Sequence, residues 1–198
     1  MNPLQPLIEQ LKKFPGIGEK SAQRLAFFVL SLSQHEANTM ADTISKTKQS
    51  IRFCDDCHNI STQPKCHICI DPKRDTTTLC IVAEPKDIFA IERTLAFKGH
   101  YHVLGGLISP LDGIQPESLR IKELQHRIKN QHYSEIIFGI NATVEGDTTI
   151  MYLQSLLDTY NVKTSTLAYG LPIGSDLDYA DEMTLTKAIS ARRQSNVQ

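Results

Sequence analysis

The stretch CDDCHNISTQPKCHIC, residues 54–69, contains four of the five cysteines of this chain. They form two Cys-x-x-Cys pairs, Cys54 with Cys57 and Cys66 with Cys69, separated by eight residues. Each pair can turn two thiolates toward one point, and two such pairs give the tetrahedral sulfur site that Zn²⁺ favours. Few apolar side chains surround them, so a metal would supply folding energy that the segment lacks. We therefore expect a closed structural zinc site.

Two disulfides, or four unrelated buried thiols, are the other interpretations of these cysteines. His58 and His67 lie beside ligand positions and can replace a cysteine, although four thiolates already complete a site. Residues 54–76 hold three Lys or Arg against four Asp, so no basic recognition helix accompanies the cysteines. We expect the segment to act as a metal-dependent joint between the parts of the chain on either side. Cys80, in an apolar run, is expected to be a buried core residue.

The composition is that of an ordinary globular protein, with 40% apolar residues, 22% charged residues and a net charge of −1. No signal-peptide pattern and no apolar stretch long enough to span a membrane are present, so we expect a soluble cytoplasmic protein with no membrane partner.

The charge is distributed unevenly along the chain. Residues 1–53 carry seven basic side chains against four acidic ones, whereas residues 140–183 carry one against seven. The basic N-terminal region can therefore bind phosphate. The acidic region 140–183 would repel phosphate unless a metal ion or a basic partner were bound there.

The front of the chain reads as helical. Asn2-Pro3 is typical of a helix start, and Leu4, Leu7, Ile8 and Leu11 recur on one helical face. The sequence FPGIG, residues 14–18, then breaks the helix, and a second helix is expected from Glu19. A third is expected through residues 37–51. The glycine turn leaves backbone amides exposed at a helix N-terminus, where an anion can bind. The alternative interpretation is a glycine-containing connection between two helices that has a packing role and does not bind an anion.

Strand and helix patterns alternate after the cysteines, which favours a parallel sheet covered on both faces. Expected strands lie at 78–83, 101–104, 136–140 and 162–168, and expected helices at 87–95, 118–129 and 149–160. Ligands gather at the carboxyl ends of such strands. The acids that fall there are Glu84, Asp112, Glu145 and Asp147. Together they are candidates for a divalent cation such as Mg²⁺. Taken individually, each acid is interpreted more simply as a solvated loop residue or a helix N-cap, and Asp147 is a good candidate for a cap.

The order of these features resembles the RecR family of bacterial recombination mediators. The segments that carry the resemblance are Leu11 to Ala22, similar to a helix-hairpin-helix, the four cysteines, LISPLDGI at 107–114, NATVEGD at 141–147, and a Walker B-like closing segment at 168–185. The resemblance implies a multi-domain α/β protein. Its parts would be a helical domain at 1–53, a zinc segment at 54–76, a Toprim-like sheet domain at 77–170, and a C-terminal segment at 171–198 with a closing helix from Thr184.

The resemblance also implies a function. Members of this family act with RecO, and in some settings RecF, to help load RecA onto gapped DNA coated by single-strand-binding protein. They are regarded as sequence-independent DNA-binding scaffolds without catalytic residues, and they form dimers or ring-like tetramers. We expect DNA contacts at Lys12, Lys13, Gly16, Gly18, Lys20 and Arg24. Zinc ligands are expected at Cys54, Cys57, Cys66 and Cys69.

Two departures from the family pattern bear on chemistry. Ala83 stands where the family usually has glutamate, and Glu84 follows one place later, which reverses its face unless the strand has ended. Ala142 replaces the usual proline. A Mg²⁺-dependent nuclease, primase or topoisomerase-like enzyme is the alternative function. None of the six tyrosines has the setting of a topoisomerase nucleophile, and no phosphate-binding Gly-x-x-x-x-Gly-Lys-Ser/Thr loop supports ATP hydrolysis.

Overall fold

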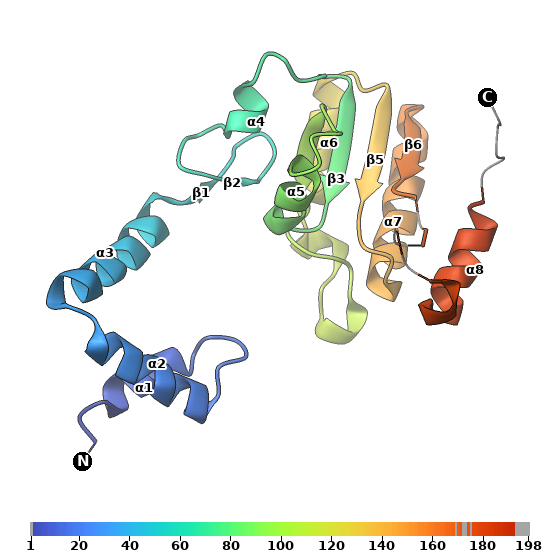
Figure 1. Cartoon of the computed structure of the whole chain (residues 1–198). Helices are drawn as coiled ribbons and strands as arrows, with labels where there is room; N and C mark the ends of the chain where they lie inside the picture. The colour runs from blue at the N-terminus through green and yellow to red at the C-terminus, as the bar shows by residue number, and fades with distance from the viewer. Residues whose placement is uncertain (1, 169, 172–173, 175, 193–198) are drawn as a thin grey trace. The chain divides into compact units, whose positions relative to one another are not determined.

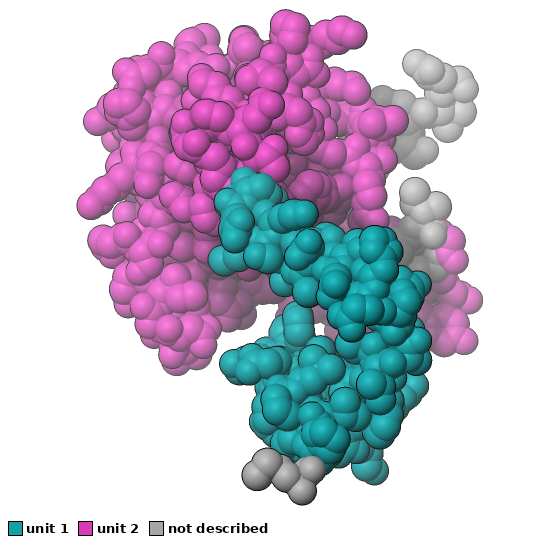
Figure 2. All heavy atoms as spheres, turned by 90° about the vertical axis from the view of Figure 1, so that its left-hand side faces the viewer, with its two compact units in different colours: residues 1–51 teal, residues 52–198 magenta. Residues whose placement is uncertain are grey.

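The structure is a computed structural model that describes residues 2–168, 170–171, 174 and 176–192. The chain divides into two compact units, residues 1–51 and residues 52–198, coloured separately in Figure 2. Their elements are labelled in Figure 1. No helix in the described part of the chain is both long and apolar enough to cross a membrane.

The first unit contains α1 (Gln5–Leu11), α2 (Glu19–Ser31) and α3 (Gln34–Ser50), which confirms the three predicted helices. Its small core consists of Ile8, Ala22 and Ala26, with leucines of α1 packed against them. The chain turns between α1 and α2 at Gly16, whose φ of 78° is readily adopted by glycine. The Asn2 side chain accepts a hydrogen bond from the Leu4 amide at 3.0 Å instead of capping α1, so the helix begins later than its Asn-Pro pair predicts.

α3 begins with a capping box. The Ser33 hydroxyl accepts a hydrogen bond from the Glu36 amide at 3.3 Å, and the Glu36 carboxylate accepts one from the Ser33 amide at 2.8 Å. None of the residues of α3 is buried. Its stability in this chain therefore depends on the cap and on local side-chain pairs more than on packing.

The second unit is built on a four-stranded parallel sheet. The strands are β3 (Thr78–Val82), β4 (His100–Val103), β5 (Glu135–Gly139) and β6 (Lys163–Thr166), in the order β4-β3-β5-β6. α5 (Pro85–Glu92) joins β3 to β4, α6 (Ile121–Asn130) precedes β5, and α7 (Val144–Leu157) precedes β6. Short 3₁₀ turns lie at Pro110–Asp112, Pro116–Ser118 and Asp158–Tyr160. The predicted α/β class is confirmed.

Alternate residues of β3 enter two separate apolar clusters. Leu79 and Ile81 of β3 and Phe138 of β5 pack with α6 and α7 in one cluster. Cys80 and Val82 of β3 belong to the other, which contains Ile88 of α5, Tyr101 and Val103 of β4, and three of the four paired cysteines. This period of two places a core on each face of the sheet.

The cysteine segment contains β1 (Arg52–Phe53), β2 (Ile60–Ser61) and the short helix α4 (His67–Ile70). It attaches to β4, the edge strand of the sheet, through a hydrogen bond from the Val103 amide to the Cys57 oxygen at 2.9 Å. Arg127 of α6 strengthens this junction, because its Nη1 donates to the backbone oxygens of Tyr101 at 2.6 Å and Asp56 at 3.2 Å. The segment and the sheet therefore form one folded unit.

α7 begins at Val144, five residues before its predicted start. The Thr143 hydroxyl caps it by accepting from the Gly146 amide at 3.1 Å, so the prediction that Asp147 is the cap is wrong. Gly146 permits this start, because a Cβ there would lie 2.0 Å from the Asn141 oxygen.

The closing segment contains a 3₁₀ turn at Leu177–Tyr179 and α8 (Glu182–Ser190), which is capped by Asp181. This confirms the expected closing helix, with a start two residues earlier. Positions 169, 172–173 and 175 of the Walker B-like stretch lie outside the described residues.

Candidate functional site

The four paired cysteines bring their sulfur atoms to one point. All four Sγ atoms lie within 4.8 Å of one another, and those of Cys57 and Cys66 are 3.5 Å apart. Tetrahedral zinc–sulfur bonds of about 2.3 Å require sulfur separations of about 3.8 Å. All five cysteines of the chain are free thiols, which excludes the disulfide interpretation in this structure. Cys54, Cys57 and Cys66 are buried, whereas Cys69 is partly exposed.

Electrostatics of the cluster favour a cation. Hydrogen bonds among the sulfurs raise the pKa of the Cys57 and Cys69 thiols and lower the pKa of Cys66, because an anion at Cys66 accepts from its two neighbours. Four thiolates can coexist at these distances only when a dication offsets their repulsion. Neither His58 nor His67 belongs to the group. The donor set fits a closed structural Zn²⁺ site, as the spacing predicts.

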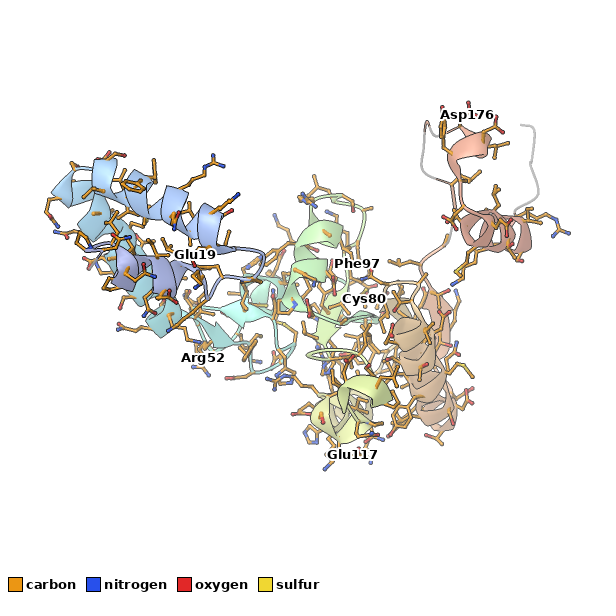
Figure 3. The ribbon with its side chains drawn as sticks, turned by 90° about the horizontal axis from the view of Figure 1, so that it is seen from below. Glu19, Arg52, Cys80, Phe97, Glu117 and Asp176 are labelled. Atoms are coloured by element: carbon orange, nitrogen blue, oxygen red, sulfur yellow. The ribbon has the colours of Figure 1, made fainter. Side chains whose placement is uncertain are left out.

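Cys80 is separate from this group. It is 2% exposed on β3, within the apolar cluster that also contains Cys54, Cys57 and Cys66, and Phe97 packs against the same cluster (Figure 3). Burial raises the pKa of its thiol to about 12. The prediction of a buried core residue is confirmed.

The turn between α1 and α2 presents an open backbone. No atom lies within 4 Å of the position that a Cβ would take at Gly16 or Gly18, and Gly18, the N-cap residue of α2, provides no side-chain cap. The amides of the first turn of α2 are therefore available to an anion. Lys20 and Arg24, one helical turn apart and exposed, line a shallow hollow with Phe27 and Phe28.

The two lysines at the end of α1 are engaged within the chain. Lys12 Nζ lies 2.8 Å from a Glu19 carboxylate oxygen and 3.2 Å from one of Glu9, and these hydrogen bonds raise its pKa. Lys13 Nζ donates to Gln10 Oε1 at 2.8 Å. The charge of Lys12 is thus partly neutralised, so Lys20 and Arg24 are the better placed cations of the six expected DNA contacts.

The four acids near the carboxyl ends of the strands each have their own surroundings. Glu84 lies beyond the end of β3, where it begins α5 and pairs with Lys86. Asp112 accepts from the Ser109 hydroxyl at 2.6 Å, and Asp147 lies 3.4 Å from Lys187 Nζ. Glu145 lies in the first turn of α7. Within the described part of the chain, the four cysteines are the one group of three or more His, Cys, Asp or Glu side chains close enough together to bind the same ion. The expected convergence of the acids is not found.

Two side chains at the junction of the cysteine segment and the sheet carry no recognisable sequence signal. Arg120 places its guanidinium 5.0 Å from the centre of the Phe53 ring. Its backbone oxygen accepts from Nε2 of His102, at 2.9 Å. Burial, followed by the nearby Arg127 charge, lowers the pKa of His102 to about 3. These contacts join segments far apart in the chain, so periodicity and spacing do not reveal them.

Comparisons with known proteins cover almost the whole chain. Family models match residues 4–48 (RecR, helix-hairpin-helix), 51–71 (the RecR zinc finger domain with four cysteines), 77–168 (Toprim domain) and 170–193 (RecR, C-terminal). The chain is 48% identical over 194 residues to "Recombination protein RecR" of Acidothermus cellulolyticus, covering 98% of each chain. It is 49% identical over 192 residues to the protein of that name from Gloeobacter violaceus, covering 97% of this chain and 98% of that protein. The chain therefore belongs to the RecR family of recombination proteins.

Proposed function

We propose that this protein is a DNA-binding scaffold in recombinational DNA repair. The observation that carries the proposal is the open glycine turn at the start of α2, beside the exposed Lys20 and Arg24. Backbone amides and flexible cations at such a turn contact phosphate without reading bases, so binding is indifferent to sequence. Lys12, Lys13, Gly16 and Gly18 complete the proposed surface. The name of its relatives supports a role in recombination.

Protein partners are the second part of the proposal. The scaffold acts with RecO, and in some settings RecF, to load RecA onto gapped DNA coated by single-strand-binding protein. The four separate acids Glu84, Asp112, Glu145 and Asp147 support a surface for a basic partner. Residues 140–183, which include Glu145 and Asp147, carry a charge of −6, while Glu84 pairs with Lys86 and Asp147 with Lys187. A net negative charge of this size attracts a basic protein over a range that depends on the salt concentration.

Self-association is the third part. The first unit has a small core but exposes large apolar side chains on two helices, namely Phe27, Phe28 and Leu30 of α2 and Met40 and Ile44 of α3. Phe27 is 62% exposed and Leu30 66%. Such a surface is costly to leave in water, which supports a homo-oligomer that buries it, as a dimer or a tetrameric ring.

The proposed organisation keeps four parts, at 1–53, 54–76, 77–170 and 171–198. The zinc segment serves as a folded joint and not as a reader of DNA. A cytoplasmic location belongs to the same proposal, because paired thiols that hold zinc must stay reduced.

Equilibrium binding to fluorescent single-stranded and duplex DNA tests the main proposal, with and without RecO, over a series of salt concentrations. The double variant Lys20→Ala/Arg24→Ala is expected to weaken binding to every sequence alike. For each phosphate that is no longer neutralised, the slope of log K against log salt concentration should fall by about 0.9 on duplex DNA and about 0.7 on single strands. Lys46→Ala, at an exposed position of α3 where the lysine pairs with Asp42, is the matched control. Equal binding by the double variant and the wild type would refute the assignment of the turn.

The Toprim match favours one other candidate, a Mg²⁺-dependent nuclease, primase or topoisomerase-like enzyme. Incubation with nicked, supercoiled and single-stranded DNA and Mg²⁺ or Mn²⁺ distinguishes the two. Cleavage, relaxation or primer synthesis that disappeared in Asp147→Ala would replace the scaffold with an enzyme.

A further inference from the structure

The four zinc ligands differ in their access to solvent. Cys54, Cys57 and Cys66 are each no more than 1% exposed. Cys69 is partly exposed and lines a cavity of about 680 Å³ between the cysteine segment and α6. A small molecule that enters this cavity meets the sulfur of Cys69 before it meets another ligand.

The lining of the cavity indicates which kind of molecule can enter. Lys65, Lys122 and Arg127 contribute positive charge, and Asp55, Asp56 and Glu123 contribute an equal negative charge. A balanced lining neither concentrates nor repels ions, so a small neutral molecule has free access. His100, 7% exposed, also lines the cavity, and neither of its ring nitrogens has a hydrogen-bond partner in the protein. Both nitrogens are buried atoms, so the polar character of the cavity wall comes from its charged side chains and from Asn130 and Gln131.

We propose that Cys69 is an oxidation site through which hydrogen peroxide opens the zinc centre. Exposure helps to decide which cysteine a peroxide oxidises, and Cys69 is the one of the four ligands that is partly exposed and lines the cavity. Cys80 is not accessible in this way, because it is buried in an apolar cluster. The chain therefore contains a reactive cysteine and an inert one within the same folded unit.

The chemistry balances in two steps. The Cys69 thiolate attacks one peroxide oxygen. An S–O bond forms, the O–O bond breaks, and sulfenic acid and hydroxide result. The Cys66 thiolate, in the same Cys-x-x-Cys turn and within 4.8 Å, then attacks the Cys69 sulfur. An S–S bond forms, the S–O bond breaks, and a second hydroxide leaves. With two protons taken from solvent, two thiolates and one peroxide give one disulfide and two waters. Only Cys54 and Cys57 would then remain as thiolate ligands, so a zinc ion held by the four sulfurs would be bound much more weakly.

Peroxide treatment of the full-length zinc protein tests this assignment, with zinc release followed by a colorimetric chelator and sulfenic acid trapped by dimedone. We expect dimedone first on Cys69 and none on Cys80. We also expect a disulfide within the tryptic peptide 66–73, which contains both Cys66 and Cys69. Dithiothreitol with added Zn²⁺ should restore the metal content. First labelling at Cys54, Cys57 or Cys80, or zinc release that leaves Cys69 unmodified, would overturn the proposal.

A pair of surface variants tests the route. Asn130, exposed on α6, lines the cavity, whereas its exposed neighbour Lys129 does not. Asn130→Trp is expected to slow zinc release several-fold by narrowing the cavity, and Lys129→Trp to leave the rate unchanged. In urea the two variants should react alike. Equal rates for both folded variants would show that peroxide reaches the sulfurs by another path.

Discussion

Replacing His102 by glutamine is expected to reduce the loss of stability that the lowered pKa of His102 predicts for this protein in mild acid. Burial lowers the folded-state pKa of His102 to about 3, and the Arg127 charge acts in the same direction. An unfolded histidine has a pKa of about 6.5. Between these two pKa values, His102 is therefore protonated in the unfolded state and neutral in the folded state. The stabilising contribution is fully present above pH 6.5 and is lost as the pH falls toward 3.

The magnitude follows from these two pKa values. Between pH 7.5 and 5.5, protonation of the unfolded state at this one site removes about 1.4 kcal/mol of unfolding free energy. Glutamine removes the titration but retains an N–H donor for the Arg120 oxygen, which His102 Nε2 contacts at 2.9 Å. His58 and His100 also have pKa values lowered by burial, and both remain in the variant, although the His58 ring, 5.4 Å from that of His102, loses one ring contact.

Urea unfolding of the zinc-loaded proteins, followed by circular dichroism at pH 7.5, 6.5 and 5.5, measures the difference. The wild type should lose about 1.4 kcal/mol more than His102→Gln over this range. His132→Gln, at an exposed position of the same unit, is the control, and its unfolding free energy should change with pH as that of the wild type does. If the unfolding free energy of His102→Gln also changed with pH as in the wild type, the assignment of a buried neutral imidazole would be wrong.

Three further predictions concern folding. Gly146→Ala is expected to lower the urea midpoint by the equivalent of about 2–3 kcal/mol, because its Cβ would lie 2.0 Å from a backbone oxygen, whereas Gly170→Ala, with no atom within 4 Å, should have little effect. Ser33→Ala should cost about 1 kcal/mol through loss of the α3 cap, seen as faster amide hydrogen exchange in α3 and unchanged exchange in the sheet. Cys57→Ser should lose zinc and destabilise the second unit before it alters DNA preference, with Cys80→Ser retaining the metal. A Cys57→Ser protein that remained fully assembled and bound DNA weakly would place the zinc segment in DNA contact instead.

Local patterns in the sequence predict most of the fold. The strands are visible because alternate residues such as Leu79 and Ile81 are buried on one face while Cys80 and Val82 are buried on the other. The start of α7 is not visible, because Gly146 and the threonines around it are poor helix formers, and the Thr143 cap and the close approach of the Asn141 backbone override that preference.

The candidate site divides in the same way. The cysteine cluster is predictable because its geometry depends on a local spacing. The pairing of Lys12 with Glu19 across the turn, and the local partners of Glu84 and Asp112, depend on side-chain directions that the sequence does not show. Convergence of acids at a sheet edge follows from topology only when their side chains have no nearer partner.

The hydrogen bond from the Val103 amide to the Cys57 oxygen links the zinc site to the edge of the sheet. β4 is the outer strand on its side of the sheet, and the zinc segment supplies the backbone acceptor for its Val103 amide. Loss of zinc would release that acceptor and leave an unpaired strand edge able to pair with another chain. Metal depletion should therefore produce β-rich aggregates whose growth depends on protein concentration, so zinc supply would set the solubility of this protein as well as its fold.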